Sequence, residues 1–264
     1  MSSPKRVLTI GDFHCGSWSG LTPPQHDSEP ALIHQHKHNL WEKRREAWKL
    51  FAGQVEALRP IDGLIANGDL LDGPSPKVGG TDSITVDVHE QAMMAADIIK
   101  FVDAEKKYAV HGTGYHTGNT VDFEDFVDDV VHFDKLGDHD WVSVNGVIFD
   151  YKHKIPSSGS RTGRATALLT ENLWADVWSL RGEYPKGAII LRSHTHYFMH
   201  VDDGMFAGFI LPALMDYGSK YGTRECRGTV DFGMVWFDVA GPNDWGWSKK
   251  LWRHSMQAPI IAWE

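Results

Sequence analysis

The fold is decided by the stretch VLTIGDFH at residues 7–14. Its first half is a short apolar run typical of a buried strand, and its second half places Asp12 and His14 directly after that strand. Functional sites in layered α/β folds gather at the carboxyl ends of strands. Four later apolar runs end in the same way, with aspartate or histidine: GLIAN before GDLLD (68–72), YAV before HGTGYH (111–116), VIFDY before KH (152–153) and AIILRS before HTH (194–196). The sequence therefore predicts one site assembled from five strand ends.

Longer stretches with helical spacing separate these runs, which is the pattern of an α/β fold. We expect strands over 7–10, 63–66, 108–110 and 188–191, helices over 40–58, 86–102 and 165–180, and a hairpin over 142–151 that turns at Asn145-Gly146. Three more strands are expected over 205–214, 230–239 and 245–252, with no helical pattern between them. We interpret residues 1–264 as one domain, with a site-bearing part (7–200) and a β-rich C-terminal part (201–264).

Composition narrows the class of protein. Of the 264 residues, 42% are hydrophobic and 23% charged, which excludes disordered, collagen-like and coiled-coil chains. The longest nearly apolar run, 205–215, is broken by Pro212 and is shorter than the roughly 20 residues of a membrane-spanning helix. The apolar run after the first basic residues is short, so we expect no signal peptide, and the two cysteines, Cys15 and Cys226, lie far apart. We therefore expect a reduced, cytoplasmic protein that does not act at a membrane.

Charge is distributed unevenly along the chain. Residues 121–140 hold eight acidic side chains against a single lysine, and their apolar spacing favours an amphipathic helix with a solvated acidic face. Residues 151–164 hold four basic side chains and no acid. A net charge of −9 argues against broad binding of nucleic acid. Four tryptophans on apolar helical stripes are expected in the core: Trp41, Trp48, Trp174 and Trp178.

The side chains at the strand ends favour metal chemistry. The chain holds 15 histidines, and the five strand ends combine imidazole with carboxylate and no thiolate. That donor set suits a hydrolytic site with Mn, Fe, Zn or Ni better than a structural zinc site. An Asp-x-His or His-x-His pair on an extended segment would direct both side chains to one face, because the strand period is two. Such pairs could hold one metal ion or two adjacent ones.

The order of these motifs resembles that of the calcineurin-like metallophosphoesterases: DFH (12–14), GDLLD (68–72), GTGYH (112–116), His153 and SHTH (193–196). The GTGYH form is similar to that of small phosphoesterases carried by bacterial viruses. The resemblance spans residues 7 to about 200. It implies a hydrolase on a β-sandwich of two mixed sheets flanked by helices, which cleaves phosphodiester or phosphomonoester bonds.

The resemblance also implies a role for each motif residue. Two divalent metal ions are implied, manganese first, with Fe, Zn or Ni as alternatives. Asp69 would bridge the ions, and a hydroxide between them would attack phosphorus. His116 would protonate the leaving oxygen, with Asp72 orienting it. The remaining ligands would be Asp12, His14 and His196 for the first ion, and His153 and His194 for the second.

The chain departs from the family pattern at two places. The asparagine that ligates the second ion in the family is missing, and Thr113 or Tyr115 stands nearest to its position. The last motif begins with Ser193 where the family has glycine. Water is an alternative to a protein ligand at the first of these places.

Several features leave alternatives open. Arg161 and Arg164 precede a predicted helix and either bind the substrate phosphate or are solvated. Histidines 26, 34, 36 and 38 lie in a polar loop that either covers the metals or is simply exposed. A DNA or RNA nuclease and a catalytically weak metal-binding scaffold are the alternative functions. An amidohydrolase is a more distant one, since it would place His-x-His on the first strand, where this chain has Asp12 and His14. The natural substrate and the oligomeric state stay open.

Overall fold

The first apolar run forms strand β1 (Lys5–Ile10), which lies inside a six-stranded sheet of order β11-β10-β1-β2-β3-β4. The computed structural model describes residues 3–31, 34–74, 80–118, 121–216 and 229–253. Strand β1 pairs in parallel with β2 and antiparallel with β10. The other strands of this sheet are β2 (Gly63–Ala66), β3 (Lys106–Val110), β4 (Lys135–Gly137), β10 (Phe232–Gly241) and β11 (Asp244–Trp252).

A second sheet has five strands in the order β5-β6-β7-β9-β8. Its central strands β6, β7 and β9 are mutually parallel, and the two outer pairs are antiparallel. Both sheets are therefore mixed, as the family resemblance implies. The strands are β5 (His139–Val144), β6 (Val147–Lys152), β7 (Ile189–Arg192), β8 (Met199–Asp202) and β9 (Ala207–Ile210).

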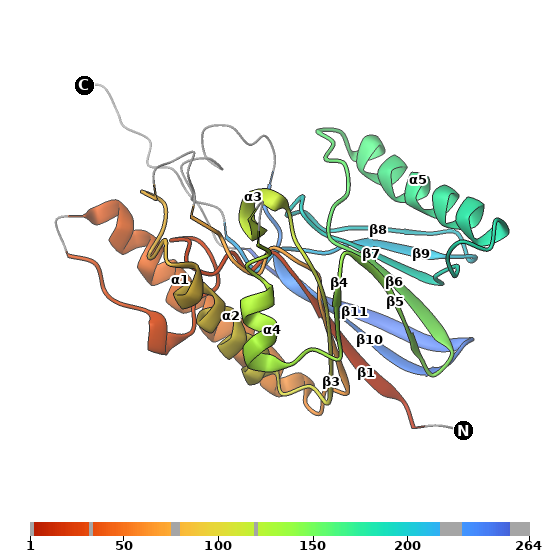
Figure 1. Ribbon diagram of the computed structural model, residues 1–264, viewed down its shortest axis with the longest axis horizontal. Coiled ribbons are helices and arrows are strands. Elements are labelled where there is room, and N and C mark those ends of the chain that lie inside the picture. Colours follow the sequence, from red (N-terminus) through yellow and green to blue (C-terminus); the bar gives the residue numbers. More distant parts are fainter. Residues whose placement is uncertain (1–2, 32–33, 75–79, 119–120, 217–228, 254–264) are drawn as a thin grey trace.

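Helices cover the outer face of each sheet, so the chain forms four layers (Figure 1). Helices α1, α2 and α4 lie on the six-stranded sheet, and α5 lies on the five-stranded sheet. The described helices are η1 (Pro24–His26, a 3-10 turn), α1 (Gln35–Leu58), α2 (Val88–Val102), α3 (Gly114–Thr117), α4 (Asp125–Val131) and α5 (Arg161–Leu180).

Alternation along β1 explains how the layers pack. Leu8 and Ile10 point towards the helices, and Val7 points into the core between the two sheets. Phe149 and Phe237 meet edge to face in that inner core, with ring centroids 5.2 Å apart. Because β1 is buried on both faces, its end is held rigidly in the middle of the molecule.

Helix ends follow capping chemistry. Asp87 accepts hydrogen bonds from the backbone amides of His89 and Glu90 and so starts α2 one residue later, close to the predicted start at residue 86. Ser160 caps α5 in the same way, by accepting a hydrogen bond from the Gly163 amide. Helix α5 therefore begins at Arg161, four residues before the predicted start at 165. Helix α1 begins at Gln35, five residues before the predicted start, so the histidine-rich loop is shorter than expected.

The predicted hairpin over 142–151 is confirmed, and its turn has the expected left-handed backbone, with φ of 47° at Asn145 and 87° at Gly146. The predicted helix over the acidic residues 121–140 is wrong in extent. Only α4 is helical there, and His132 ends it in a left-handed conformation before β4 and β5 begin. Of the four tryptophans expected in the core, only Trp48 packs against a buried cluster, Trp41 and Trp178 are half-buried outside the clusters, and Trp174 is 49% exposed.

The described strands of the C-terminal part belong to both sheets. Strands β10 and β11 join the six-stranded sheet beside β1, and β8 and β9 join the other. Residues 217–228 and 254–264 of this part, and with them Cys226, lie outside the described residues. In the described part of the chain, no helix has the length and hydrophobicity to cross a membrane.

Candidate metal centre

The predicted site residues converge at the carboxyl ends of the strands. The segments that follow β1, β2, β3, β6 and β7 supply three groups of metal-binding donors, and donor atoms within each group lie within 4.8 Å of one another. The groups are Asp12, His14 and His196; Asp69, His153 and His194; and His14, Asp72 and His116. All eight residues predicted as ligands or catalytic groups are therefore brought together.

The backbone that carries these side chains is unusual. Among the described residues, eight that are not glycine have a positive φ, and five of these are site residues: Asp12, His14, Asp69, His194 and His196, with φ between 47° and 76°. Convergence at the strand ends is as predicted, but the extended geometry predicted for the Asp-x-His and His-x-His pairs is wrong. Asp12 and His14 lie beyond the end of β1 in left-handed conformations, not on an extended segment with a period of two. Each such residue costs about 1–3 kcal/mol, which is typical of functional sites.

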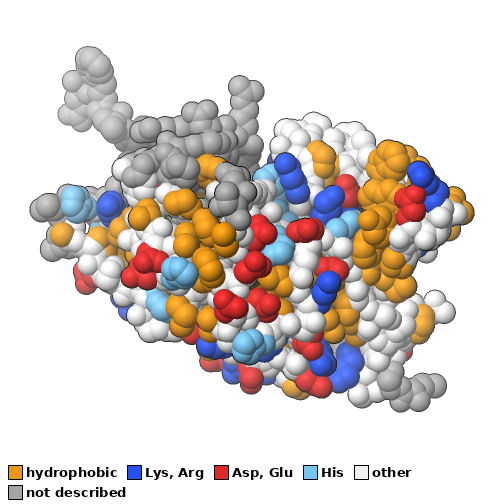
Figure 2. Space-filling view, viewed as in Figure 1, with side chains coloured by type: hydrophobic (Ala, Val, Ile, Leu, Met, Phe, Trp, Pro, Cys, Tyr) orange, Lys and Arg blue, Asp and Glu red, His pale blue; other side chains and the backbone are white. Residues whose placement is uncertain are grey.

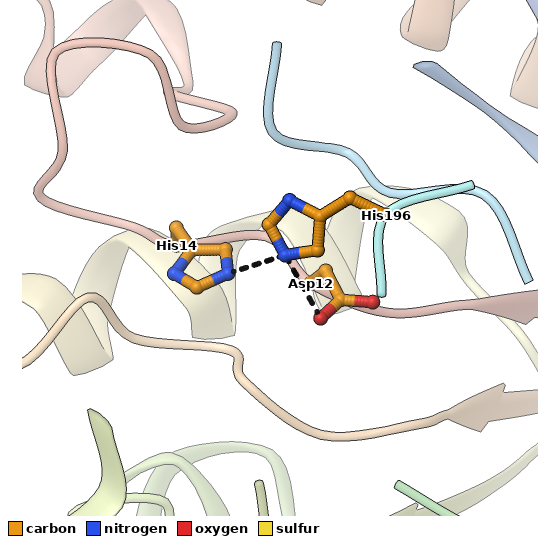
Figure 3. A group of neighbouring side chains, drawn as sticks. All are labelled: Asp12, His14 and His196. Atoms are coloured by element: carbon orange, nitrogen blue, oxygen red, sulfur yellow. Dashed lines mark hydrogen bonds and ion pairs between the residues drawn. The ribbon is translucent and has the colours of Figure 1, made fainter. Parts of the chain in front are cut away.

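The first group lies between the loops after β1 and β7 (Figure 3). The Nε2 atoms of His14 and His196 are 3.1 Å apart, and His196 Nε2 is 3.3 Å from Asp12 Oδ1. The other oxygen of Asp12, Oδ2, accepts a hydrogen bond from the backbone amide of His194. Asp12 is fully buried and His14 is 3% exposed. Three electron-pair donors thus face a common point.

The second group is built around Asp69. His153 Nε2 lies 3.0 Å from Asp69 Oδ2, and the His153 and His194 rings are 5.4 Å apart. His153 Nδ1 is 2.7 Å from the carbonyl oxygen of Asn67, to which it donates. That bond leaves Nε2 as the atom available to a ligand.

His116 forms the third part of the site. Its ring packs edge-on against His14, with centroids 4.5 Å apart. Its Nδ1 is 2.7 Å from the backbone carbonyl oxygen of Asp72 and 3.8 Å from the Asp72 carboxylate. The carboxylate lies nearer His14 Nδ1, at 3.3 Å. Asp72 therefore holds His116 through its main chain rather than through the predicted carboxylate.

Burial disfavours charge on these side chains, but opposite charges outweigh it. Burial opposes ionisation of Asp69, yet His153, His116 and His14 hold its pKa below the ordinary range. Burial also opposes protonation of His153, yet Asp69 and Asp12 raise its pKa to about 10. The two side chains thus behave as a buried ion pair.

The donor atoms fit a divalent cation better than they fit one another. Asp12 Oδ1, His14 Nδ1 and His153 Nε2 are buried and have no hydrogen-bond partner among the described residues, although each lies near another side chain. Two ligands held about 2.1 Å from one ion at right angles are about 3 Å apart. The separations of 3.0–3.3 Å within the groups match that spacing.

The two departures from the family pattern have structural counterparts. Thr113 donates to Asp69 Oδ1 from its amide, at 2.7 Å, and from its hydroxyl, at 3.2 Å. Tyr115 instead packs against the His116 ring. Ser193 accepts a hydrogen bond on its hydroxyl from the Asn67 side chain, whose Nδ2 also donates to the Lys152 carbonyl. Asn67 therefore ties together the ends of β2, β6 and β7.

Sequence reasoning missed both Asn67 and the buried Glu124. Asn67 directly precedes the GDLLD motif, and that position was the signal that could have revealed it. Glu124 stands in the acidic stretch, eight residues after His116, and no motif marks it. Its carboxylate is fully buried and accepts hydrogen bonds from the amides of Leu70 and Gly112.

The remaining predicted residues lie at the edge of the site or away from it. Arg164 stacks on Tyr197, the neighbour of His196, with its guanidinium 3.7 Å from the ring centroid, whereas Arg161 is exposed. Of the histidines predicted in the polar loop, His26 pairs with Asp97 and His34 is exposed, whereas His38 lies in the first turn of α1 and pairs with Glu29. The His36 side chain lies outside the described residues. No described loop histidine joins one of the donor groups.

Comparison with known proteins finds similarity in structure only. No family model and no curated protein matches the chain. Among solved structures, the chain is similar to Vps29 of Entamoeba histolytica complexed with zinc, at 12% identity over 93% of this chain and 98% of that one, with a TM-score of 0.44. A novel archaeal phosphodiesterase matches at 10% identity over 94% and 99%, with a TM-score of 0.46. A predicted phosphoesterase from Streptococcus pneumoniae matches at 10% identity over 95% and 100%, with a TM-score of 0.39. These similarities are distant, so the chemistry of the site has to rest on its own residues.

Proposed function

We propose that the chain is a metallophosphoesterase that uses two divalent cations to hydrolyse a small phosphodiester or phosphomonoester. The observation that carries this proposal is the pair of adjacent donor groups, one around Asp12 and one around Asp69, with His116 packed against the first. Buried carboxylate and imidazole groups without thiolate are the ligands of hydrolytic metal sites. Asp12, His14 and His196 would hold one cation, and Asp69, His153 and His194 the other, with Asp69 shared.

In this reaction, the protein itself supplies and orients the acid. Bound divalent cations supply Lewis acidity at phosphoryl oxygens and lower the pKa of water. His116 donates a proton to the leaving oxygen. Its bond to the Asp72 carbonyl fixes the orientation of the ring. Burial and the neighbouring His14 lower the pKa of His116, which makes its imidazolium a stronger acid.

The charges around the site favour a small ester over a nucleic acid. Figure 2 shows acidic side chains over α4 and the segments beside it. Asp122 and Asp125 are exposed there and lie close to His111, the residue that directly precedes the 112–116 motif. They would repel a polyanion. Arg164 is held against Tyr197 and donates from Nε to the Ser158 carbonyl, and in this proposal it contacts a single phosphate.

The test is hydrolysis resolved by metal and by substrate. Protein freed of metal with a chelator is reloaded with Mn, Ni, Zn or Mg and assayed on bis-p-nitrophenyl phosphate and on p-nitrophenyl phosphate. We expect metal-dependent turnover that falls at least ~10²-fold in Asp69→Asn. Asp244→Asn, on the exposed start of β11, is the matched control and should keep full activity. Arg164→Gln should raise KM for the preferred ester while leaving bound metal unchanged.

The alternatives give different results in the same assay. A nuclease would cleave single- or double-stranded DNA or RNA faster than either small ester, with a steep loss of rate as salt rises. A scaffold would bind two ions and turn over neither ester. Equal activity of Asp69→Asn and the unaltered protein would contradict the proposed site.

A further inference from the structure

Glu124 connects two segments of the candidate metal centre. It immediately precedes α4, its side chain is completely buried, and each carboxylate oxygen accepts one main-chain amide. Oε1 accepts from Leu70 at 2.9 Å, and Oε2 accepts from Gly112 at 2.7 Å. Leu70 follows Asp69 directly, and Gly112 begins the segment that carries His116. One carboxylate therefore joins the β2 end to the β3 end.

A third hydrogen bond closes this connection into a ring. The amide of Thr113, next to Gly112, donates to Asp69 Oδ1 at 2.7 Å. The two segments are also in direct contact, because a Cβ on Gly112 would lie 2.1 Å from Asp69 Oδ1 and 2.3 Å from the Asp69 amide. A residue at position 112 with any side chain would push them apart. The position of Asp69 is thus set by the neighbouring segment rather than by its own loop alone.

Only a carboxylate of this length satisfies the arrangement. Two amide donors that face one side chain require two acceptor oxygens. Glutamine has the same size but would turn an NH₂ group towards one of the amides, and aspartate is too short by one methylene to reach both. Buried donors left without acceptors are costly, so the segments would move to find water or another partner.

We propose that Glu124 is a positioning residue that holds the shared ligand Asp69 in register with His116. This inference rests on the proposed function. Loss of the Glu124 carboxylate weakens the cation bound by Asp69, His153 and His194 and slows the step that uses His116. The cation bound by Asp12, His14 and His196 is affected less, since Asp69 is only its shared ligand and Glu124 reaches the His14 segment indirectly, through the carbonyls of Asp69 and Leu70.

The experiment compares Mn²⁺ binding and kinetics in two variants. Titration calorimetry counts the ions and gives each affinity for the unaltered protein, Glu124→Gln and Asp62→Asn. Asp62 is the matched control, because its carboxylate also accepts a main-chain amide, that of Arg6, but at the opposite end of the sheet. We expect Glu124→Gln to bind one of the two ions about 10–100-fold more weakly and to lose a similar factor in kcat, with KM unchanged. Asp62→Asn should keep both affinities.

Each outcome separates this inference from the proposed function. If the unaltered protein binds two ions and Glu124→Gln binds both equally well with unchanged kcat, Glu124 is only part of the packing and the inference fails. If the unaltered protein binds no Mn²⁺, the proposed function itself fails. Circular dichroism verifies folding, and if Glu124→Gln does not fold, Glu124→Asp is judged by the same criteria.

Discussion

His116 is the residue on which turnover should depend most without affecting metal binding. Its Nδ1 is engaged by a backbone carbonyl, so the opposite nitrogen, Nε2, is the one that can exchange a proton with a substrate. The ring touches His14 through its edge, which places it beside the first donor group. The two tasks that we propose for the site, binding cations and moving a proton, thus fall on adjacent rings.

Replacement of His116 by asparagine should lower kcat at least ~10²-fold. Metal content, measured by atomic emission, should not change. His89→Asn is the control, since His89 is an exposed histidine that packs on Phe126 and belongs to none of the donor groups. Unchanged turnover in His116→Asn would remove the proposed role of His116 as the acid.

At the scale of residues, the sequence predicted which side chains converge better than it predicted how they are held. Asp12, His14 and Asp69 were identifiable because each follows a short apolar run. Their left-handed backbone could not be predicted, because it depends on hydrogen bonds between loops, such as the one from the Asp12 amide to the Gly68 carbonyl. Glu124 was hidden for a similar reason: its function comes from amides that lie 12 and 54 residues away.

Among the elements, the β5–β6 hairpin forms an edge of its own sheet and also contacts the opposite sheet through its turn. Its turn residue Asn145 donates from Nδ2 to the carbonyls of Ser3 and Val239, the latter in β10 of the opposite sheet. The turn therefore ties the two sheets together at the end away from the site. Gly146 completes it with φ of 87°.

We expect Gly146→Ala to destabilise the protein by about 1–3 kcal/mol, because alanine is strained at positive φ. Its Cβ would also lie 2.8 Å from Pro242 Cγ. Gly53→Ala gives the opposite expectation, since Gly53 lies in α1 with nothing near its Cβ position, and alanine should stabilise the helix by about 0.5–1 kcal/mol. Thermal unfolding of both variants measures the difference. A Gly146→Ala protein as stable as the unaltered one would contradict the strained turn.

A buried charge network joins β6 to its neighbours. Asp150 Oδ1 accepts from Arg192 Nη1 at 2.7 Å and lies 2.9 Å from His139 Nε2, while Glu171 of α5 pairs with Arg192 Nε. Burial opposes the charge on Asp150, but Arg192 and His139 outweigh it and lower its pKa. A lowered carboxyl pKa gives stability that is present above the unfolded value, about 3.9, and is lost as the pH falls below it.

Asp150→Asn should therefore cost about 3–5 kcal/mol at pH 7, because the buried Arg192 loses its fully buried counter-charge and keeps only the partly exposed Glu171. The deficit should shrink below about pH 4, where Asp150 of the unaltered protein also loses its charge. Urea unfolding of both proteins from pH 3 to 8 measures how this difference in the free energy of unfolding changes with pH. Arg181→Ala is the comparison, since its pair with Glu183 is exposed and should contribute less than about 1 kcal/mol at any pH. A deficit that stayed constant with pH would show that packing, not charge, dominates at Asp150.

At this scale, helices and strands with a clear period were predicted to within a few residues, as α2 shows. The acidic stretch was not, because its apolar residues satisfy a helical pattern over 121–131 and then a strand pattern over 135–144. A left-handed residue, His132, separates the two. No local signal distinguishes such a stop from a continuing helix.

In the whole molecule, the candidate site lies where strand ends of the two sheets meet. The ends of β1 and β2 belong to one sheet and those of β6 and β7 to the other. Cations bound there would connect both sheets. Their binding is therefore expected to stabilise the fold as a whole, and not only the loops that touch them.

Removal of metal should lower the thermal unfolding temperature. At a free Mn²⁺ concentration 100 times Kd, one site adds about 2.7 kcal/mol, which corresponds to roughly 5–10 °C for a chain of this size. Scanning calorimetry with and without a chelator measures the shift. Asp69→Asn should show a smaller response to Mn²⁺ than Asp244→Asn. An unfolding temperature that does not depend on Mn²⁺ would argue against tight binding of the folded state.

The left-handed conformations of Asp12, His14, Asp69, His194 and His196 also bear on how this site could decay during evolution. Glycine, and to a lesser degree asparagine, adopts that conformation at lower cost than histidine. A gene copy released from selection for catalysis would therefore gain stability by exchanging these residues for glycine or asparagine. Descendants that have kept the fold but lost the chemistry should carry such replacements at these five positions first, and at His116 and His153, whose φ is not positive, only later.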